Sequence, residues 1–295
     1  MKHRLTYWLA YAGMLLMASL PLGMLYAVSD MLYVLLRHVL RYRRRTVRTN
    51  LRNSFPEKTD AELRDIEKKF YHYICDYVVE EIKTLRITAD ELQRRMVYEN
   101  PEVIVDAVRK HRCAFLMMSH YGSFEWTMGL ALALDKDCKP IQIYKPLHNK
   151  YMDNLFLHIR SRFGGINVPK HSTARSLLRL YRDGQSMAVG FITDQSPNRN
   201  EARYWTTFLN QDTVFMDGAE KLAKMFDAAV FYCDIRRERR GYSRIHFRLL
   251  TETPKQTADG EITESFARCL EESIRRDPPY WFWSHKRWKI KREDV

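Results

Sequence analysis

The sequence predicts an α/β fold with a mainly parallel central sheet flanked by helices, preceded by an N-terminal membrane-anchoring helix. Short apolar segments alternate with helical patterns of roughly 10–15 residues, which is typical of a parallel sheet covered on both faces. A separate, longer apolar segment opens the chain, and no internal repeat or low-complexity linker follows it. We therefore expect two parts: an anchor with a basic juxtamembrane segment over residues 1–55, and one folded domain over residues 56–295.

The N-terminal segment is long and apolar enough to cross a membrane. From Leu5 to Ser29 it contains no charged residue, and about 20 apolar residues suffice for a transmembrane helix. The arginines that follow are Arg37, Arg41, Arg43, Arg44, Arg45, Arg48 and Arg52. Because only Lys2 and Arg4 lie on the other side, the positive-inside rule places the rest of the chain in the cytoplasm, where these arginines can hold anionic headgroups. Pro21 allows a kinked helix or one that enters a single leaflet; a signal peptide and a buried core helix are the alternatives.

Composition limits the class of protein. The chain has 295 residues, 45% of them hydrophobic, with a net charge of +13. The mean hydropathy of −0.46 excludes a polytopic membrane protein, and the apolar content excludes a mainly disordered chain. The positive charge favours an anionic partner, which charge alone leaves open between nucleic acid, anionic lipid and an acidic carrier protein. Five scattered cysteines predict buried free thiols in a reducing compartment.

The domain is expected to alternate helices and strands. Residues 60–85 show helical spacing of apolar side chains, with Asp60 as the cap, and 113–119 is a continuous apolar run typical of a strand buried on both faces. The other expected strands are 141–144, 186–192, 229–235 and 243–250, and the other expected helices are 126–134, 149–163, 173–182, 218–226 and 262–276. The basic run 236–240 is interpreted as a solvated turn between the last two strands.

A histidine and a carboxylate five positions apart are the main candidates for chemistry. Dinucleotide, phosphate-loop, serine-hydrolase and zinc-protease motifs do not occur in the sequence. The segment from His120 to Glu125 carries the pair, but His148 and Asp153 have the same spacing, so the spacing alone is weak. Context distinguishes the two pairs. His120 follows the buried-strand run, and so belongs at the carboxyl edge of the sheet where open α/β folds keep their sites.

The residues between His120 and Glu125 suit a catalytic turn. Gly122 lets backbone N–H groups approach a reactant, and Ser123 can cap the next helix. Glu125 would then lie in the first turn of that helix and fold back onto one ring nitrogen. A histidine held in this way is a general base, because its pKa lies near neutrality and a carboxylate fixes its tautomer.

Several segments together resemble one enzyme family. The motif SHYGSFEW at 119–126, after an apolar strand, resembles the His-x-x-x-x-Asp/Glu motif of glycerolipid-type acyltransferases. More specifically, the chain resembles the bacterial lipid A late acyltransferases (the lauroyl/myristoyl acyltransferase family). The supporting segments are the N-terminal anchor, RYRRRTVRTNLRNSFP (41–56), IYKPLHN (143–149), IRSRFGG (159–165), ITDQSP (192–197), VFMDGAEKLAKMFDAAV (214–230) and WFWSHKRWK (281–289).

The resemblance implies transfer of a fatty acyl chain, usually from acyl carrier protein, to a hydroxyl of a lipid A precursor at the cytoplasmic face of the inner membrane. His120 would be the general base oriented by Glu125, and N–H groups around Gly122 and Ser123 would bind the oxyanion. No cofactor, metal or nucleic-acid partner is implied. The acidic carrier and the phosphates of the acceptor account for the positive charge.

The same resemblance suggests substrate-binding residues. Lys145 stands where family members usually have arginine, and keeps a charge for a phosphate without the bidentate fork. Arg160 and Arg162 are phosphate-binding candidates with solvated helix-end arginines as the alternative, and Asp194 at a strand end is a site carboxylate or a turn residue. The aromatic and basic segment 278–289 is expected to form an interfacial belt or a cap over the site.

Two alternatives remain open on the sequence. One is acylation of a lysophospholipid or aminolipid acceptor by the same chemistry. The other is a non-catalytic basic protein that binds a membrane or nucleic acid.

Overall fold

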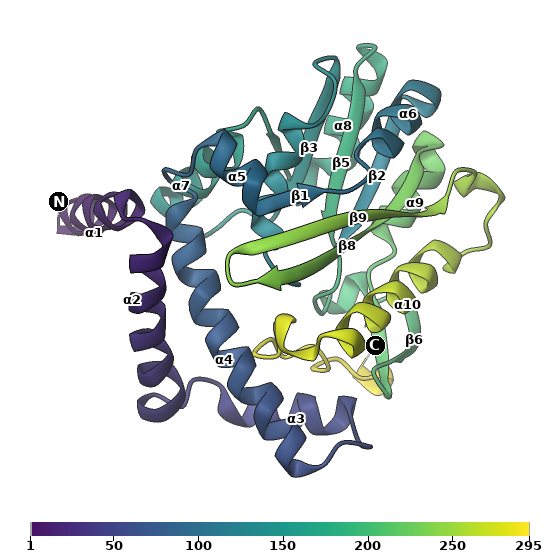
Figure 1. The fold of residues 1–295 in the computed structure, drawn as a ribbon. Coiled ribbons are helices and arrows are strands. Elements are labelled where there is room, and N and C mark those ends of the chain that lie inside the picture. The colour runs from purple at the N-terminus through teal and green to yellow at the C-terminus, as the bar shows by residue number, and fades with distance from the viewer. Residues whose placement is uncertain (1, 295) are drawn as a thin grey trace.

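A seven-stranded sheet forms the centre of the computed structural model, which describes residues 2–294 apart from the side chains of 2–7, 9 and 294 (Figure 1). The strands are β1 (Met96–Tyr98), β2 (Cys113–Met118), β3 (Cys138–Tyr144), β4 (Ile166–Pro169), β5 (Ser186–Ile192), β8 (Ala229–Arg239) and β9 (Tyr242–Thr251). Their order is β1-β9-β8-β2-β5-β3-β4, and every neighbouring pair is parallel except the β8–β9 hairpin. The predicted mainly parallel α/β fold is confirmed.

Strand β2 is the most buried part of the sheet. All six of its residues are buried, and it pairs with β5 on one side and β8 on the other. A strand with parallel neighbours and both faces covered must be apolar throughout, which is why this run has no alternating pattern. The five cysteines are free and buried, as the sequence predicts.

Helices pack on the sheet, and further helices lie beside it. They are α3 (Arg44–Ser54), α4 (Asp60–Lys83), α5 (Ala89–Arg95), α6 (Glu102–His111), α7 (Lys150–Ser161), α8 (Thr173–Arg182), α9 (Gly218–Phe226) and α10 (Glu261–Arg276). Helix α6 packs on β2 and β5, α9 on β2, and α10 on β8 and β9. Helix α4 begins with a capping box in which Thr59, rather than the predicted Asp60, is the cap and Glu62 its partner.

Several regions differ from the sequence prediction, among them the short strands β1 and β4 and the helices α5 and α6, which were not expected. The segment expected to be helical at 126–134 is a 3-10 helix, η2 (Phe124–Leu132), packed against α5, β1 and β3. A separate antiparallel hairpin, β6 (Tyr204–Phe208) and β7 (Gln211–Phe215), was not expected. The solvated turn predicted at 236–240 is instead largely strand, since β8 continues to Arg239, and Arg237 and Arg240 both form ion pairs with Asp76.

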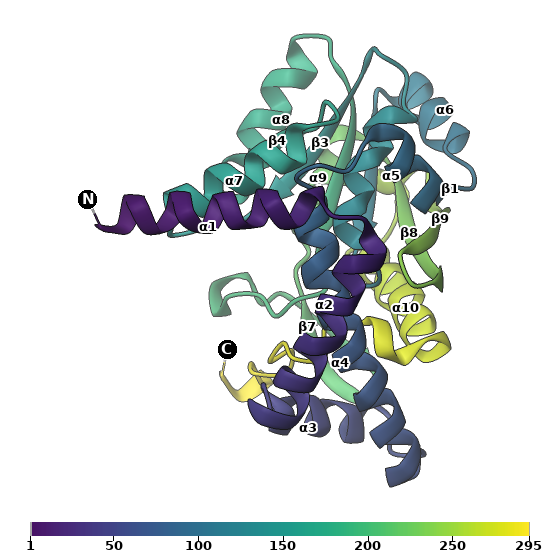
Figure 2. The same cartoon turned by 60° about the vertical axis from the view of Figure 1, so that its left-hand side comes forward.

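The N-terminal apolar segment forms two helices, broken at Pro21. Helix α1 (Lys2–Ser19) contacts α4 through its C-terminal half and extends past the body toward its N-terminal end. Helix α2 (Leu22–Val34) runs along α4 and continues into the π-helical turn η1 (Leu35–Val39), as Figure 2 shows. Judged by length and composition alone, Leu22–Val39 is the one stretch of helix among the described residues that is long and apolar enough to cross a membrane. Pro21 lacks the N–H that would continue α1, so two helices replace a single straight one.

Candidate functional site

The register of two neighbouring strands brings a histidine and an aspartate together. In the parallel β2–β5 pair Met118 is level with Ile192, so the second residue after each strand end lies at the same place on the sheet edge. Those residues are His120 and Asp194. The His120 Nδ1 lies 2.7 Å from Asp194 Oδ1, and the His120 backbone N–H donates to Asp194 Oδ2 at 3.1 Å. His120 therefore occupies the predicted edge of the sheet, with a carboxylate from the next strand as its partner.

Asp194 is held as a buried, ionised acceptor. Its residue exposure is 1%, and Oδ2 also accepts a hydrogen bond from Trp281 Nε1 at 2.8 Å. Burial alone would raise the pKa of Asp194, but the neighbouring His120 and the hydrogen bonds from His120 and Trp281 lower it overall. An ionised carboxylate can only accept, so a proton lies on Nδ1 of His120, and in the neutral imidazole Nε2 is then the nitrogen that can accept a proton.

The His120 ring faces a cavity between two phenylalanines. Its centroid lies 5.0 Å from that of Phe124 and 5.7 Å from that of Phe282, and its side chain remains 22% exposed. Among the described residues, none forms a hydrogen bond with the Nε2 of His120. This arrangement suits a general base whose second nitrogen is fixed by a carboxylate.

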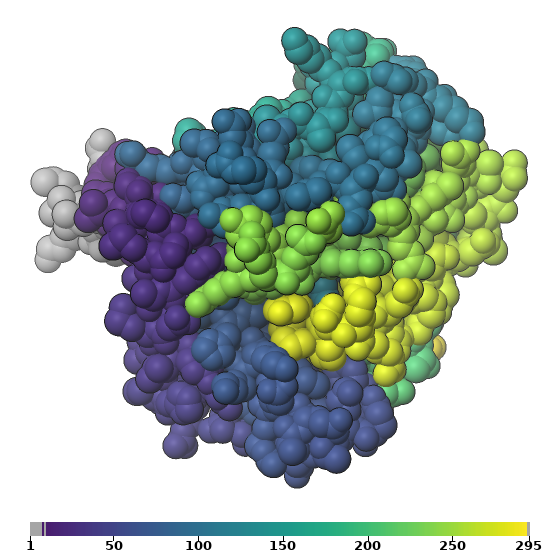
Figure 3. All heavy atoms as spheres, viewed as in Figure 1, coloured from purple at the N-terminus to yellow at the C-terminus, as the bar shows by residue number. Residues whose placement is uncertain are grey.

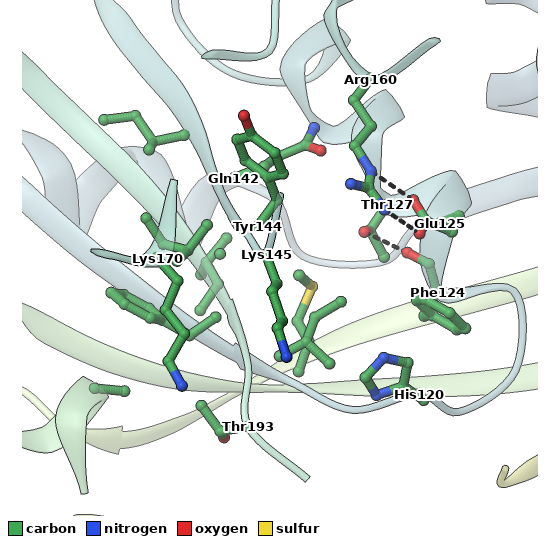
Figure 4. A pocket seen from close by; sticks show the side chains of 18 of the residues that line it. His120, Phe124, Glu125, Thr127, Gln142, Tyr144, Lys145, Arg160, Lys170 and Thr193 are labelled. Carbon is green, nitrogen blue, oxygen red and sulfur yellow. Dashed lines mark hydrogen bonds and ion pairs between the residues drawn. The ribbon is translucent and has the colours of Figure 1, made fainter. Parts of the chain in front are cut away.

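Glu125 does not hold this ring. Its carboxylate accepts two hydrogen bonds from Arg160, at 2.6 Å from Nη2 and 3.1 Å from Nε, and Figure 4 shows this pair set apart from His120 on the cavity wall. The expectation that Glu125 orients His120 is thus corrected: Asp194 takes the Nδ1 side of the ring. Glu81 lies near the same pair, and burial, reinforced by the charge of Glu125, raises the pKa of Glu81 well above its ordinary value. Arg160 is therefore the cation that balances a small acidic group.

The turn after His120 is closely packed, and the amide of its glycine already donates a hydrogen bond. Gly122 has φ +58°, and its N–H donates to the Tyr280 carbonyl at 2.9 Å. A Cβ at this position would lie 2.9 Å from Ile235 Cγ2, which explains the glycine. Ser123 is buried, and its hydroxyl donates to Glu80 at 3.4 Å instead of capping η2. Neither residue lines the cavity, so the predicted oxyanion role of the Gly122 amide is also corrected.

The cavity beside His120 has a volume of about 1030 Å³. Its apolar walls include Leu116, Met118, Met128, Leu130, Leu134, Ile141, Ile143, Phe156, Ile192, Leu222, Phe247 and Phe282. Its polar groups include Ser196 and the residues Gln142, Lys145, Arg160, Lys170 and Thr193, which Figure 4 labels. A space of this size and lining can hold an alkyl chain together with a polar head.

The predicted substrate-binding residues separate into two groups. Lys145 and Arg160 lie on the cavity wall, whereas Arg162 donates to the backbone carbonyls of Thr84 and Ile87 and lies outside the lining. The Arg162 side chain thus joins the helix before it to the end of α4. Asp194 does not itself line the cavity; it contacts His120, which does.

The loop after β5 adds groups that sequence reasoning missed. The hydroxyls of Thr193 and Ser196 are buried and lack a hydrogen-bond partner among the described residues, and both residues line the cavity. The Ser196 N–H donates to His285 Nε2 at 3.2 Å, and burial lowers the pKa of His285 to about 4. His285 is thus a neutral acceptor that fixes this loop.

The C-terminal aromatic segment contacts both members of the His120–Asp194 pair. Trp281 donates a hydrogen bond to Asp194, Phe282 packs on His120, and the Tyr121–Trp281 bridge joins the segment to the turn after His120. The sequence pointed to a cap over the site here but not to these contacts. Aromatic residues next to a histidine near the end of the chain were the available signal.

Fold and site together define an α/β enzyme with a His–Asp pair at the carboxyl edge of its sheet, beside a large apolar cavity. A family model described as bacterial lipid A biosynthesis acyltransferase matches residues 1–290. The chain belongs to this family and is an acyltransferase.

Two relatives bear the same description. A lipid A biosynthesis acyltransferase of Haemophilus influenzae is 24% identical over 226 residues, covering 76% of this chain and 69% of the relative. A lipid A biosynthesis acyltransferase of Shigella flexneri is 21% identical over 293 residues, covering 97% of this chain and 92% of the relative.

Proposed function

We propose that this protein transfers a fatty acyl chain from an acyl thioester, with acyl carrier protein as the donor, to a hydroxyl of a lipid A precursor. The observation that supports this most directly is the His120–Asp194 pair, which presents a free Nε2 to an apolar cavity of about 1030 Å³. The family match over residues 1–290 supports the lipid acceptor.

His120 acts as the general base. Nε2 takes the proton of the acceptor hydroxyl while that oxygen attacks the thioester carbonyl carbon, and Asp194 stabilises the imidazolium that forms. Collapse of the tetrahedral intermediate breaks the carbon–sulfur bond, and the leaving thiolate receives the proton from Nε2. The new carbon–oxygen bond thus replaces the carbon–sulfur bond, and the proton taken from the hydroxyl ends on the thiol.

The oxyanion is bound from the loop after β5. The Gly122 amide is occupied by Tyr280, whereas the hydroxyls of Thr193 and Ser196 are buried, lack described partners and belong to residues that line the same cavity as His120. Either hydroxyl, once its side chain turns toward the cavity, can stabilise developing charge without first breaking another hydrogen bond.

Basic residues bind the anionic parts of the substrates. Lys145 lies on the cavity wall, and Arg160 holds Glu125 there as an ion pair that gives the wall a fixed polar surface. We assign Glu125 to this surface, where it can contact the acceptor, rather than to the histidine ring. The N-terminal helices attach the enzyme to the inner membrane, with the catalytic domain on the cytoplasmic side.

The test is a reaction of the purified full chain with acyl carrier protein carrying a labelled acyl group and a lipid A precursor, analysed by mass spectrometry. We expect one added acyl chain with the intact chain and loss of turnover with His120→Ala. His148→Ala is the matched control, because this second histidine does not line the cavity, and it should keep its activity. Transfer to lysophospholipid or aminolipid acceptors but not to the lipid A precursor would overturn the assigned acceptor.

A further inference from the structure

Helix α2 is docked on the catalytic domain by one face. Leu22, Leu25, Ser29 and Tyr33 are buried and recur at helical spacing, so they form a stripe along the side that packs on α4. Figure 3 shows α2 lying against α4, with the tip of the β8–β9 hairpin reaching the same place. The helix is therefore part of the folded body along its length, whereas α1 contacts the body through its C-terminal half.

Polar contacts fix α2 in this position. Ser29 Oγ donates to Asp76 Oδ1 at 2.7 Å, and Tyr26 OH donates to Glu80 Oε1 at 2.9 Å. Arg240 joins Asp30 at 2.7 Å to Asp76 at 2.6 Å, linking α2, the hairpin and α4. A helix that left the body to cross a bilayer would expose the charge of Asp30 to hydrocarbon and leave the buried Asp76 with fewer partners. These contacts argue against a spanning α2.

The opposite face of α2 and η1 is apolar and exposed. Met24 is 56% exposed, Met31 is 65% exposed, and Val34 and Leu35 continue the same surface. Val39 and Leu40, 67% and 61% exposed, extend it to the end of η1. Contiguous exposed apolar side chains of this kind mark an interaction surface, whereas Met225 and Leu249 are exposed elsewhere on the domain.

Basic residues at the end of this surface select the partner. Arg41 and Arg45 are exposed next to Leu40, while Arg44 and Arg48 are used internally by the buried Glu67. An apolar strip that ends in exposed arginines matches the hydrocarbon boundary and anionic headgroups of a bilayer. A second copy of this chain would present the same positive charges, which disfavours self-association through this face.

Helix α1 has the geometry of the inserted element. Its last turn is fixed to the body by Lys83, whose Nζ donates to the carbonyls of Ala18 at 3.2 Å and Leu20 at 2.9 Å. Tyr11, Met14, Leu15 and Met17 pack against the core on one side of the helix, Leu16 on the other side is 72% exposed, and the N-terminal end of α1 extends past the domain (Figure 2). In Figures 1 and 2, α7, which contributes Phe156 and Arg160 to the cavity wall, lies on the side toward which α1 extends.

We propose that α2 lies in the plane of an anionic bilayer surface, with the face formed by Met24, Met31, Val34 and Leu35 in the lipid and the opposite face docked on α4, and that α1 is the segment that enters the bilayer. This inference rests on the proposed membrane attachment and divides it between two helices. It places the α7 wall of the cavity close to the lipid from which the acceptor comes.

A fluorescent probe at Met31 tests the placement of α2. The full chain with Met31→Cys is labelled with an environment-sensitive dye, bound to vesicles of phosphatidylcholine and phosphatidylglycerol, and quenched by spin-labelled lipids at shallow or deep positions. Met225→Cys is the matched control, and the unsubstituted chain gives the background because its five cysteines are buried. We expect several-fold brighter emission at 31, with stronger quenching by the shallow label, and no quenching at 225.

Each other outcome overturns the proposal in a different way. Stronger quenching of position 31 by the deep label would mean that α2 crosses the bilayer. Unquenched emission from a chain that floats with the vesicles would mean that attachment holds but α2 lies outside the lipid. A chain that does not float at all would overturn the proposed attachment as well.

Charge substitutions give a second measurement. Met31→Glu combined with Leu35→Glu should lower vesicle partitioning at least tenfold, because two side chains lose their place in the lipid. Met225→Glu combined with Leu249→Glu should change it less than twofold. Equal effects of the two pairs would contradict a lipid-facing α2. Circular dichroism checks that all four changes leave the fold intact.

Discussion

Replacing Asp194 by asparagine tests the His–Asp pair through the tautomer of His120. In the protein Asp194 Oδ1 accepts from Nδ1, while Oδ2 accepts from the His120 amide and from Trp281 Nε1. An asparagine has one oxygen and one NH₂ group. The oxygen must take the Oδ2 position, because two N–H donors point there, and the NH₂ group then faces Nδ1.

The consequence is a histidine with its proton on the wrong nitrogen. An NH₂ group donates to Nδ1, so the ring proton moves to Nε2 and the base facing the cavity is lost. In serine proteases the equivalent loss lowers kcat about 10⁴-fold, and we expect a decrease of roughly 10³–10⁴-fold here with KM little changed. The assay is steady-state acyl transfer by the purified full chain across a range of acceptor concentrations.

Glu125→Gln is the matched comparison, since it also neutralises one carboxylate of the site. It removes the charge partner of Arg160 but touches no ring nitrogen, so we expect kcat to fall less than about tenfold. If Glu125→Gln were as damaging as Asp194→Asn, or if Asp194→Asn kept near-normal kcat, the assignment of Asp194 as the group that holds His120 would be wrong.

Three further predictions follow from individual contacts. Trp281→Phe keeps the ring but removes one hydrogen bond to ionised Asp194, so kcat should fall about 5- to 20-fold in the same assay, and an unchanged kcat would show that the bond is dispensable. Because the pKa of His285 is lowered to about 4, the unfolded chain binds a proton near pH 6.5 that the folded chain refuses, so the free energy of unfolding should drop by up to about 3 kcal/mol as the pH falls from 6.5 to 4. Denaturant titrations at several pH values should show that the free energy of unfolding depends less on pH in His285→Gln than in the unsubstituted chain. An equal pH dependence in the two chains would refute this prediction. Gly122→Ala combines a φ of +58° with a 2.9 Å contact to Ile235 and should destabilise the fold by about 2 kcal/mol, whereas Gly164→Ala (φ +93°, open space) should cost about 1 kcal/mol; equal losses in thermal melts would mean that Ile235 gives way.

The long strands were predictable because their physical signals are strong. The run at 113–118 is apolar because both faces are covered, and β5 at 186–192 matches its predicted range. Strands β1 and β4 have only three and four residues, too short for periodicity to register. The β6–β7 hairpin turns through Leu209 and Asn210, both at positive φ, and leucine is not a residue that signals such a turn.

The site was predictable only as far as local sequence determines it. His120 follows a buried strand, which places it at the sheet edge, and Asp194 lies two residues after the end of another buried strand, which places it at the same edge. That these two strands are neighbours depends on the order of the sheet, which the sequence does not show, and so the sequence alone favours the nearer Glu125 as the partner of the histidine. Its ion pair with Arg160 and the bond from Trp281 to Asp194 join segments 35 and 87 residues apart, which no local pattern specifies.

The central claim, that this chain acylates a lipid A precursor with His120 as the base, is tested most directly by the lipid A mass spectrum of its host. The spectrum is compared between the parent, a strain lacking the gene, and that strain carrying the intact chain or His120→Ala. We predict that one acyl chain disappears in the deletion, returns with the intact chain and stays absent with His120→Ala. Lipid A that is unchanged by the deletion, in a host with no second copy, would contradict the claim.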